Sequence, residues 1–217
     1  MTKVSSITLT YDEANNIREC LKSISWCDEH IVIDEYGDDN TKSIAESIGA
    51  DVYQAQTPDD AASFDILRKN AIREATNNYI LRIDADERSH QALNKRLQDL
   101  VDSSGVDVVE VPRMTFIRDR WIKTGYRWWP DRSPVLFDKN KMSVTDNVHG
   151  FMSPCNDADI IQLPAESDSA LYHYSYESLV DLIRRRWRYA QMEANQYDLP
   201  LDMTLYYAIS DLIEGII

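Results

Sequence analysis

The chain has 217 residues, enough for one well-packed domain or for one domain with an appended subdomain. Its formal net charge of −14 and its pI near 4.6 argue against nonspecific binding to nucleic acid, which needs a basic face. No run of about 18 apolar residues is present, so we expect no membrane-spanning helix. Three cysteines without metal-ligand spacing, and no signal-peptide pattern, favour a reducing, cytoplasmic location.

The first half of the chain alternates short apolar runs with segments of helical periodicity. The apolar runs predict strands over residues 6–10, 31–34, 51–54 and 79–83. The spacing of apolar residues between these runs predicts helices over residues 15–24, 41–48 and 64–75. Gly49 is suited to end the second helix because glycine readily adopts the left-handed conformation of a C-cap. Alternation of this length implies right-handed crossovers and a parallel sheet in an α/β fold.

The run from Tyr79 ends in Asp84-Ala85-Asp86-Glu87, which is the most informative segment of the sequence. On an extended backbone, Asp84 and Asp86 project to the same side. Two carboxylates held that close repel each other unless a cation lies between them, and oxygen ligands suit Mg²⁺ or Mn²⁺. The alternative interpretation is a strand followed by a helix-capping aspartate, since Asp is a good N-cap.

Acidic residues also follow other predicted strands. Asp12 comes just after the first strand and Asp34 ends the second. Ligands of parallel α/β sheets bind beyond the carboxyl ends of the strands. The sequence therefore predicts a substrate site at the edge of the sheet where Asp12, Asp34, Asp84 and Asp86 meet.

The second half differs in composition from the first. A helix is predicted over residues 91–101, a strand over 106–111 that Pro112 ends, and a helix over 177–195. Residues 114–137 are dense in aromatic and arginine side chains, which suit sugar rings and phosphates. The alternative is a small β-subdomain packed on its own tryptophans.

Several motifs occur along the chain in a fixed order. They are Thr10-Tyr11-Asp12-Glu13, Cys20-Leu21-Lys22-Ser23, Trp26, Ile33 to Thr41, Asp84 to Glu87, Trp128-Trp129-Pro130-Asp131, Val148-His149 and His173-Tyr174-Ser175. Together they resemble the family 2 glycosyltransferases with the GT-A fold, in particular the branch of the lipopolysaccharide-core β-1,4-glucosyltransferases. Because the motifs span residues 4 to about 195 in order, the resemblance is more specific than any one of them.

The resemblance implies a GT-A (Rossmann-like), mostly parallel central sheet flanked by helices, with a small aromatic-rich acceptor subdomain and C-terminal helices. It divides one continuous domain into a nucleotide-sugar-binding half, residues 1–112, and an acceptor-binding half, residues 113–217. The implied activity is inverting, metal-dependent hexosyl transfer from a nucleoside-diphosphate sugar, UDP-sugar foremost, to a glycan or lipid-linked acceptor. The alternatives are a non-catalytic nucleotide-sugar-binding or assembly subunit, and a nucleotidyltransferase, whose glycine-rich pyrophosphate loop is absent here.

Nucleotide contacts follow from the same resemblance. Thr10, Asp12 and Glu13 are expected to line the base and ribose pocket, and Asp34 to accept a hydrogen bond from the base. Arg68 is expected to contact the diphosphate through a charge-assisted hydrogen bond. The alternatives are a first-turn acid favoured by the helix dipole for Glu13 and a solvated helix charge for Arg68.

Metal and catalytic roles are likewise implied. Asp86 is expected to be a direct ligand of Mn²⁺ or Mg²⁺, Asp84 a second ligand or a ribose contact, and His149 a further ligand or a diphosphate contact. Asp131 is the candidate general base, because an inverting displacement needs a carboxylate within reach of the acceptor hydroxyl. The alternatives are a structural histidine for His149 and a Pro-Asp turn for Asp131.

The sequence departs from the family pattern at four places. Asp12 stands where Asn is usual, Glu35-Tyr36-Gly37-Asp38 replaces Ser-Gly-Ser-Thr, Val135 replaces an arginine, and Gly150 replaces a glutamate. These changes affect the expected donor and acceptor more than the expected reaction.

An arginine-rich segment, Arg184-Arg185-Arg186-Trp187-Arg188, lies in the last predicted helix. Arginines with a tryptophan suit a lipid headgroup layer, so we expect contact with a membrane surface at its cytoplasmic face or with a lipid-linked acceptor. The alternative is pairing with acidic residues of the protein itself. Contact with a second copy of the chain also stays open.

Overall fold

The computed structural model describes residues 1–55, 63–123, 129–144 and 152–197. A curled sheet runs through it in the order β3-β2-β1-β4-β8-β6-β12-β5, and β7 and β11 also pair with β6. The main-sheet strands are β1 (Val4–Thr10), β2 (Glu29–Asp34), β3 (Asp51–Gln54), β4 (Tyr79–Arg82), β5 (Glu87–Arg88), β6 (Val108–Ile117), β7 (Arg120–Trp121), β8 (Asp131–Asp138), β11 (Ile160–Gln162) and β12 (Leu171–Tyr176).

The remaining elements are helices and one strand pair. The α-helices are α1 (Ile17–Ser23), α2 (Thr41–Ser47), α3 (Ser63–Glu74), α4 (Gln91–Ser104) and α5 (Leu179–Tyr197). Strands β9 (Met142–Val144) and β10 (Met152–Pro154) pair antiparallel, and short 3₁₀ turns lie at Lys139–Lys141 and Ser167–Ser169.

The predicted strand–helix order of the first half is confirmed, with bounds that shift by at most two residues. Strands β1, β2, β3 and β4 run parallel to one another. Gly49 follows the last turn of α2 with a φ of 93°, a left-handed conformation that glycine adopts without strain. The carboxyl ends of these strands therefore meet at one edge, as predicted.

The predicted end of a strand at Pro112 is wrong. Strand β6 continues through Pro112 to Ile117. Pro112 lies between the part of β6 that pairs with β11, residues 108–110, and the part that pairs with β12, residues 113–117. On that side of β6 the pairing has a gap at Pro112, where a missing N–H costs little, while on the other side Pro112 stays paired with Arg132 of β8. The strand is therefore not interrupted. The predicted division of the chain after residue 112 thus falls inside β6.

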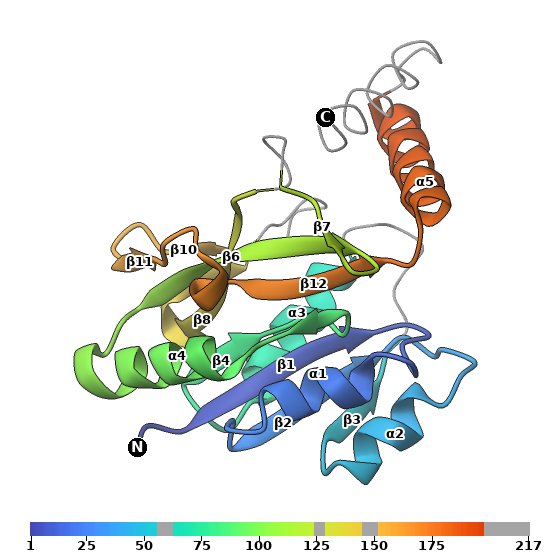
Figure 1. Cartoon of the computed structure of the whole chain (residues 1–217). Coiled ribbons are helices and arrows are strands. Elements are labelled where there is room, and N and C mark those ends of the chain that lie inside the picture. Colours follow the sequence, from blue (N-terminus) through green and yellow to red (C-terminus); the bar gives the residue numbers. More distant parts are fainter. Residues whose placement is uncertain (56–62, 124–128, 145–151, 198–217) are drawn as a thin grey trace.

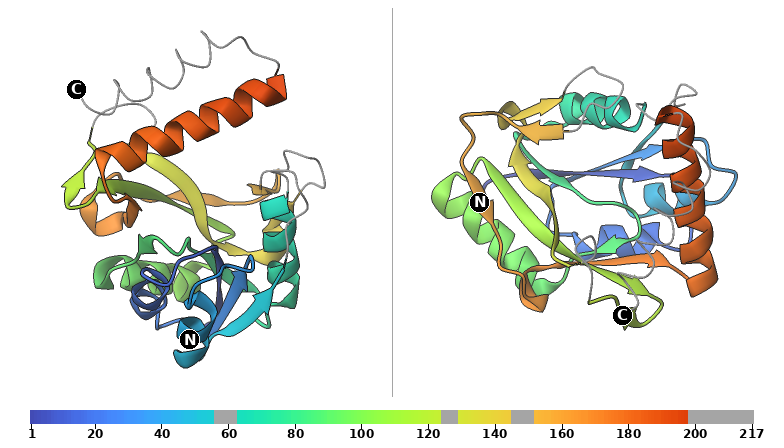
Figure 2. Two further views of the ribbon diagram at one scale, coloured as in Figure 1. Left: turned by 90° about the vertical axis from the view of Figure 1, so that its right-hand side faces the viewer. Right: turned by 90° about the horizontal axis from the view of Figure 1, so that it is seen from above.

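Strand β8 joins the two halves of the chain. It lies antiparallel between β4 and β6, so the sheet is parallel from β3 to β4 and mixed beyond. The core lies on both faces of this sheet: α1 and α4 pack on one face and α3 on the other (Figures 1 and 2). Alternate residues of one strand serve opposite faces, as Ile80 and Leu81 of β4 do.

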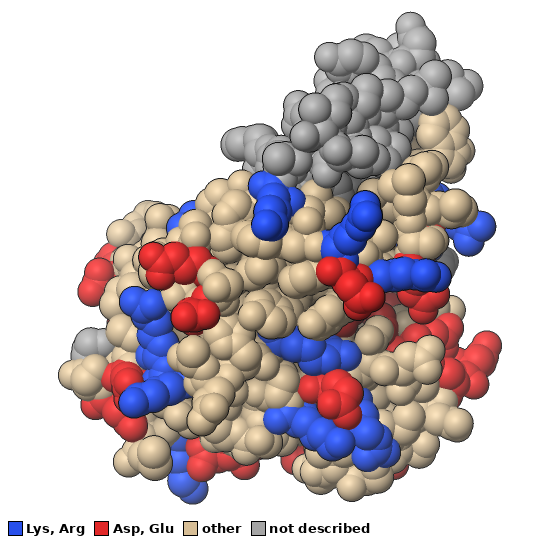
Figure 3. All heavy atoms as spheres, viewed as in Figure 1, with Lys and Arg blue, Asp and Glu red and all other residues tan. Residues whose placement is uncertain are grey.

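Helix α5 extends across one end of the molecule (Figure 2). Its Leu182 is 1% exposed and packs with Tyr176 and Ile122 in a small cluster of its own. Leu179, Val180 and Ile183 of the same helix stay exposed. Of the helices in the described ranges, none combines the length and apolarity that crossing a bilayer demands. On the face shown in Figure 3, acidic and basic side chains alternate rather than forming one basic patch.

Replacing Phe137 by alanine should destabilise the protein by about 3–5 kcal/mol, because this ring is fully buried on β8 between the two halves. Urea unfolding followed by circular dichroism measures the change. Tyr53→Ala is the control, since Tyr53 is half exposed on the edge strand β3 and its loss should cost much less. An equal effect of both substitutions would contradict the packing described for β8.

Candidate functional site

A cavity of about 850 Å³ opens at the carboxyl ends of β1 and β4. Its wall includes Thr10, Asp12 and Glu13 after β1, Asp84 and Asp86 after β4, and Arg68 from α3. Further wall residues come from β6, β12 and α5: Arg113, His173, Ser175, Tyr176, Asp181, Arg184, Arg185 and Arg188. The cavity thus brings together six of the residues predicted from sequence and adds a cationic side that had not been assigned to the site.

The acidic turn after β4 is held by a buried glutamate. Glu87 is 2% exposed, and its Oε2 accepts a hydrogen bond of 2.9 Å from the backbone N–H of Asp84. Arg113 lies 3.5 Å from the Oε1 of Glu87 and also bonds the carboxylate of Asp131. Arg88 donates a hydrogen bond of 2.7 Å to the carbonyl of Ala85. These contacts fix the turn so that Asp84 and Asp86 face the cavity.

Arginines set the charge state of the turn. Burial acts to raise the pKa of Asp84, but Arg68, whose Nη2 lies 3.2 Å from Oδ1 of Asp84, and Arg82 together hold it below its ordinary value. Glu87 shows the opposite balance, because burial and the neighbouring Asp84 raise its pKa despite Arg113. Asp84 is therefore kept ionised at the cavity wall, as a metal or diphosphate site requires.

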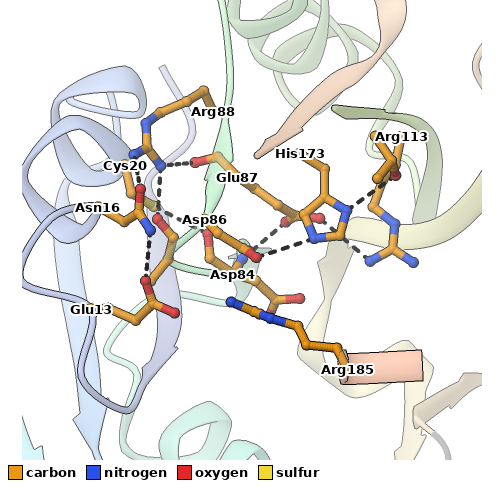
Figure 4. Close-up of polar contacts among 12 residues, drawn as sticks. Glu13, Asn16, Cys20, Asp84, Asp86, Glu87, Arg88, Arg113, His173 and Arg185 are labelled. Carbon is orange, nitrogen blue, oxygen red and sulfur yellow. Dashed lines mark hydrogen bonds and ion pairs between the residues drawn. The ribbon is translucent and has the colours of Figure 1, made fainter. Parts of the chain in front are cut away.

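His173 on β12 is a site residue that the sequence reasoning did not assign. Its Nε2 lies 3.3 Å from Oδ2 of Asp86, and its Nδ1 lies 3.2 Å from the hydroxyl of Thr115 (Figure 4). Burial, the largest single influence, acts to lower the pKa of His173, but the hydrogen bond to Asp86 together with the negative charges of Asp86 and Glu87 raises it. The His173-Tyr174-Ser175 motif was the signal for this residue, although its place beside Asp86 depends on the pairing of β12 with β5, where His173 lies opposite Glu87, and with β6.

The donor atoms at this turn fit a hard divalent cation. The carboxylates of Asp84 and Asp86 and the imidazole of His173 supply oxygen and nitrogen, which Mn²⁺ and Mg²⁺ accept while keeping positions for phosphate oxygens. Within the described ranges, no three His, Cys, Asp or Glu side chains are already gathered around one point. His149, predicted as a further ligand, lies outside the described residues.

Asp12 organises the loop after β2. It takes a φ of 55°, and its Oδ1 accepts a hydrogen bond of 2.9 Å from the backbone N–H of Asp38. A Cβ on Gly37 would lie 2.7 Å from this oxygen, so the loop can approach Asp12 only with glycine there. The two departures from the family pattern, Asp12 and the loop Glu35-Tyr36-Gly37-Asp38, are therefore in direct contact.

The other residues expected near the nucleotide differ in exposure. Glu13 accepts a hydrogen bond of 2.8 Å from Asn16, and burial raises its pKa. Thr10 lines the cavity, and its hydroxyl lies 3.2 Å from Oδ1 of Asp34. Asp34 itself is 2% exposed and lies behind Thr10, where it also accepts from Gln54. Its contact with a base remains a prediction.

Asp131 begins β8 and is tied to Arg113, whose Nε donates to it at 2.9 Å. Arg113 is part of the cavity wall, whereas Asp131, whose side chain is 33% exposed, is not. Its role as general base remains a prediction.

Of the described aromatic side chains of residues 114–137, Phe116, Trp121 and Trp129 pack with other aromatic rings. The Trp121 and Trp129 rings are 5.0 Å apart, edge to face, and Phe116 stacks on Tyr174 at 5.3 Å. In the part of the chain that is described, none of that segment's aromatics lines the cavity.

The fold and the site define an α/β protein whose ligand cavity lies beyond the carboxyl ends of parallel strands, with ionised carboxylates and arginines in its wall. The profile of the family described as "Glycosyl transferase family 2" matches residues 5–158. The chain therefore belongs to glycosyl transferase family 2.

Three comparisons illustrate the relationship. The chain is 33% identical over 203 residues to an uncharacterized glycosyltransferase from Rickettsia felis, covering 89% of this chain and 70% of that protein. TarS from S. aureus shares its fold with a TM-score of 0.54 and 16% identity, over 89% of this chain and 40% of TarS. Glucosyl-3-phosphoglycerate synthase from Mycobacterium tuberculosis, crystallised with Mn²⁺ and UDP, superposes with a TM-score of 0.42 and 19% identity over 53% of this chain.

The fold is thus the α/β GT-A fold that was expected. The chain spans less than half the length of each of the two solved chains, namely 40% of TarS and 44% of the synthase. The particular branch of lipopolysaccharide-core enzymes is not established by these relatives.

Replacing Glu87 by alanine should destabilise the protein by about 1–3 kcal/mol, because the substitution leaves the Asp84 N–H without this acceptor. Arg113, whose side chain is 22% exposed, keeps Asp131 as a carboxylate partner. Urea unfolding measures the loss. Glu19→Ala is the matched control, since Glu19 is 61% exposed and pairs only with Lys22, so its loss should change stability by less than about 0.5 kcal/mol. A Glu87→Ala protein as stable as this control would refute the structural role of Glu87.

Proposed function

We propose that the protein is an inverting, metal-dependent glycosyltransferase that moves a hexosyl group from a nucleoside-diphosphate sugar, UDP-sugar foremost, to a glycan or lipid-linked acceptor. The observation that carries this proposal is the turn of Asp84 and Asp86 in the cavity wall, with Arg68 at 3.2 Å from Asp84. The lipopolysaccharide-core β-1,4-glucosyltransferase branch remains the proposed branch, on the strength of the ordered motifs alone.

Asp86, Asp84 and His173 would hold the divalent cation, with His149 proposed as a further ligand from the sequence. When bound, Mn²⁺ or Mg²⁺ supplies Lewis-acid stabilisation of the negative charge on a leaving diphosphate. Asp84 serves this role because its neighbouring arginines keep it ionised. Arg68 contributes a charge-assisted hydrogen bond to the same diphosphate.

The nucleotide is held by the first two strands. Thr10, Asp12 and Glu13 form the part of the cavity wall where a base and ribose would lie. Asp34 positions the Thr10 hydroxyl from behind. Because Asp12 also fixes the loop around Asp38, nucleotide preference should depend on this loop as much as on direct contacts.

Asp131 is the proposed general base, which takes the proton of the acceptor hydroxyl during inversion. Arg113 links it to Glu87 and thereby to the acidic turn. Proton uptake by Asp131 requires its pair with Arg113 to loosen when the acceptor binds. Arg113 then stays available at the cavity wall, where it faces the developing negative charge.

A contact with the cytoplasmic face of a membrane is proposed for the far side of α5. The exposed Leu179, Val180 and Ile183 on this helix support it. They provide the apolar surface that an interfacial helix buries.

Binding of UDP should depend on a divalent cation. Calorimetry with UDP and Mn²⁺ should give an affinity at least tenfold higher than with UDP and EDTA, and Asp86→Asn should remove most of this gain. Asp51→Asn is the control, because Asp51 is an exposed acid at the opposite end of a parallel strand. Equal UDP affinity with Mn²⁺ and with EDTA would rule out the metal role.

Asp131→Asn should lower sugar transfer by about 10²–10⁴-fold, the usual effect of losing a general base, while UDP affinity stays nearly unchanged. Release of UDP from UDP-sugars in the presence of acceptor measures transfer. Asp157→Asn serves as the control, because Asp157 is 75% exposed and pairs with Lys141. Normal turnover by Asp131→Asn would assign the base to another residue. Donor binding without any turnover by the unmodified protein would favour the non-catalytic alternative.

A further inference from the structure

One face of α5 presents a row of charged side chains to the cavity. Asp181, Arg184, Arg185 and Arg188 are spaced by three and four residues, so they lie along one side of the helix, and all four line the cavity. Leu182 fixes the rotation of the helix by packing with Tyr176 and Ile122. The sequence predicts that this arginine segment contacts a membrane surface or a lipid-linked acceptor, and in the structure Arg184, Arg185 and Arg188 line the cavity.

The arginines of this row differ in what they contact. Arg185 donates from Nε to Asp181 at 3.2 Å, and its guanidinium carbon lies 5.9 Å from the centre of the Tyr176 ring. It extends from α5 toward the acidic turn (Figure 4). Arg184 is exposed and has no hydrogen bond or ion pair within the described ranges, and Arg188 is exposed beside it, one turn further along the helix.

The row carries more positive charge than its own acid offsets. Helix α5 contributes three arginines and one aspartate to the cavity wall, and Glu13, Asp84 and Asp86 contribute acids from other segments, in a protein whose formal net charge is −14. The diphosphate of the donor is already assigned to the turn of Asp84 and Asp86 and to Arg68, which come from β4 and α3 in the first half of the chain. Helix α5 comes from the second half and offers guanidinium groups to a second anion.

We infer that Arg184 and Arg188 bind an oxyanion carried by the acceptor, either a phosphate monoester or a carboxylate. This inference rests on the proposed function and narrows the acceptor to anionic molecules. Guanidinium groups suit such groups because their paired N–H donors match two oxygens at once. Elsewhere the acidic protein repels anions, so a local cationic row would direct the charged end of the acceptor to α5.

Calorimetry on the full chain tests this inference with three probes of one ring structure: glucose 6-phosphate, glucuronate and glucose. Each is titrated at fixed ionic strength, with and without Mn²⁺ and UDP. We expect at least one anionic probe to bind about tenfold or more tightly than glucose, the usual gain from a charge-assisted hydrogen bond. The phosphate and carboxylate arms identify which oxyanion the row prefers.

The double variant Arg184→Gln/Arg188→Gln should lose this preference while its UDP affinity with Mn²⁺ changes less than about threefold. Both side chains are exposed, so the packing of α5 is unaffected. Arg18→Gln is the control, since it removes one positive charge by the same substitution at an exposed position on α1, and it should keep the preference.

Several results would overturn the inference. Equal or undetectable binding of all three probes by the unmodified protein would do so, as would an unchanged preference in the double variant. A loss of UDP affinity as large as the loss of probe affinity would assign these arginines to the donor diphosphate instead. Failure of the proposed function is distinguishable, because UDP would then not bind with Mn²⁺ while the preference for anionic probes persisted without UDP.

Discussion

The site depends on one buried carboxylate. Glu87, 2% exposed, accepts the N–H of Asp84 on one oxygen and faces Arg113 on the other. A buried carboxylate costs free energy unless it is hydrogen-bonded and paired, and here both conditions are met by groups of the site itself. The contacts that offset the free-energy cost of burying Glu87 therefore also fix the direction of Asp84 and Asp86. Through Arg113 they also connect the acidic turn after β4 to Asp131 at the start of β8.

This arrangement explains how an acidic protein can present a site for anionic substrates. The carboxylate of Asp84 is kept ionised by nearby arginines, and with Asp86 it is suited to a divalent cation. The remaining cationic groups come from three separate elements, α3, β6 and α5, and converge on the cavity. Neither a basic surface nor a basic composition is needed, because the positive charge is concentrated where phosphate groups would lie.

Much of the fold could be predicted from the sequence because its first half is locally determined. Period-two and helical spacings located β1 to β4 and α1 to α3, and Gly49 marked the end of α2. The error at Pro112 arose because the cost of a proline depends on which strands pair beside it, and that is a tertiary property. The acidic edge was predictable because parallel strands bring their carboxyl ends together.

The remainder of the site could not be derived from local pattern. His173 reaches Asp86 because β12 pairs with β5 and β6, both more than 50 residues earlier in the chain. The direction of the arginines on α5 depends on how Leu182 packs, and sequence spacing shows that they share a face without showing where that face points. Asp131 was singled out by its motif, but its pairing with Arg113 was visible only in the folded structure.

The most direct test of the account is the position of the cation itself. Crystals grown with UDP and Mn²⁺ should show one anomalous-scattering peak in the cavity, with carboxylate oxygens of Asp84 or Asp86 at about 2.0–2.6 Å, the range of oxygen ligands of hard cations. The UDP phosphates should lie on the same peak, and the base should lie beside Thr10 and Glu13. A manganese peak away from this turn, or UDP bound outside the cavity, would contradict the account.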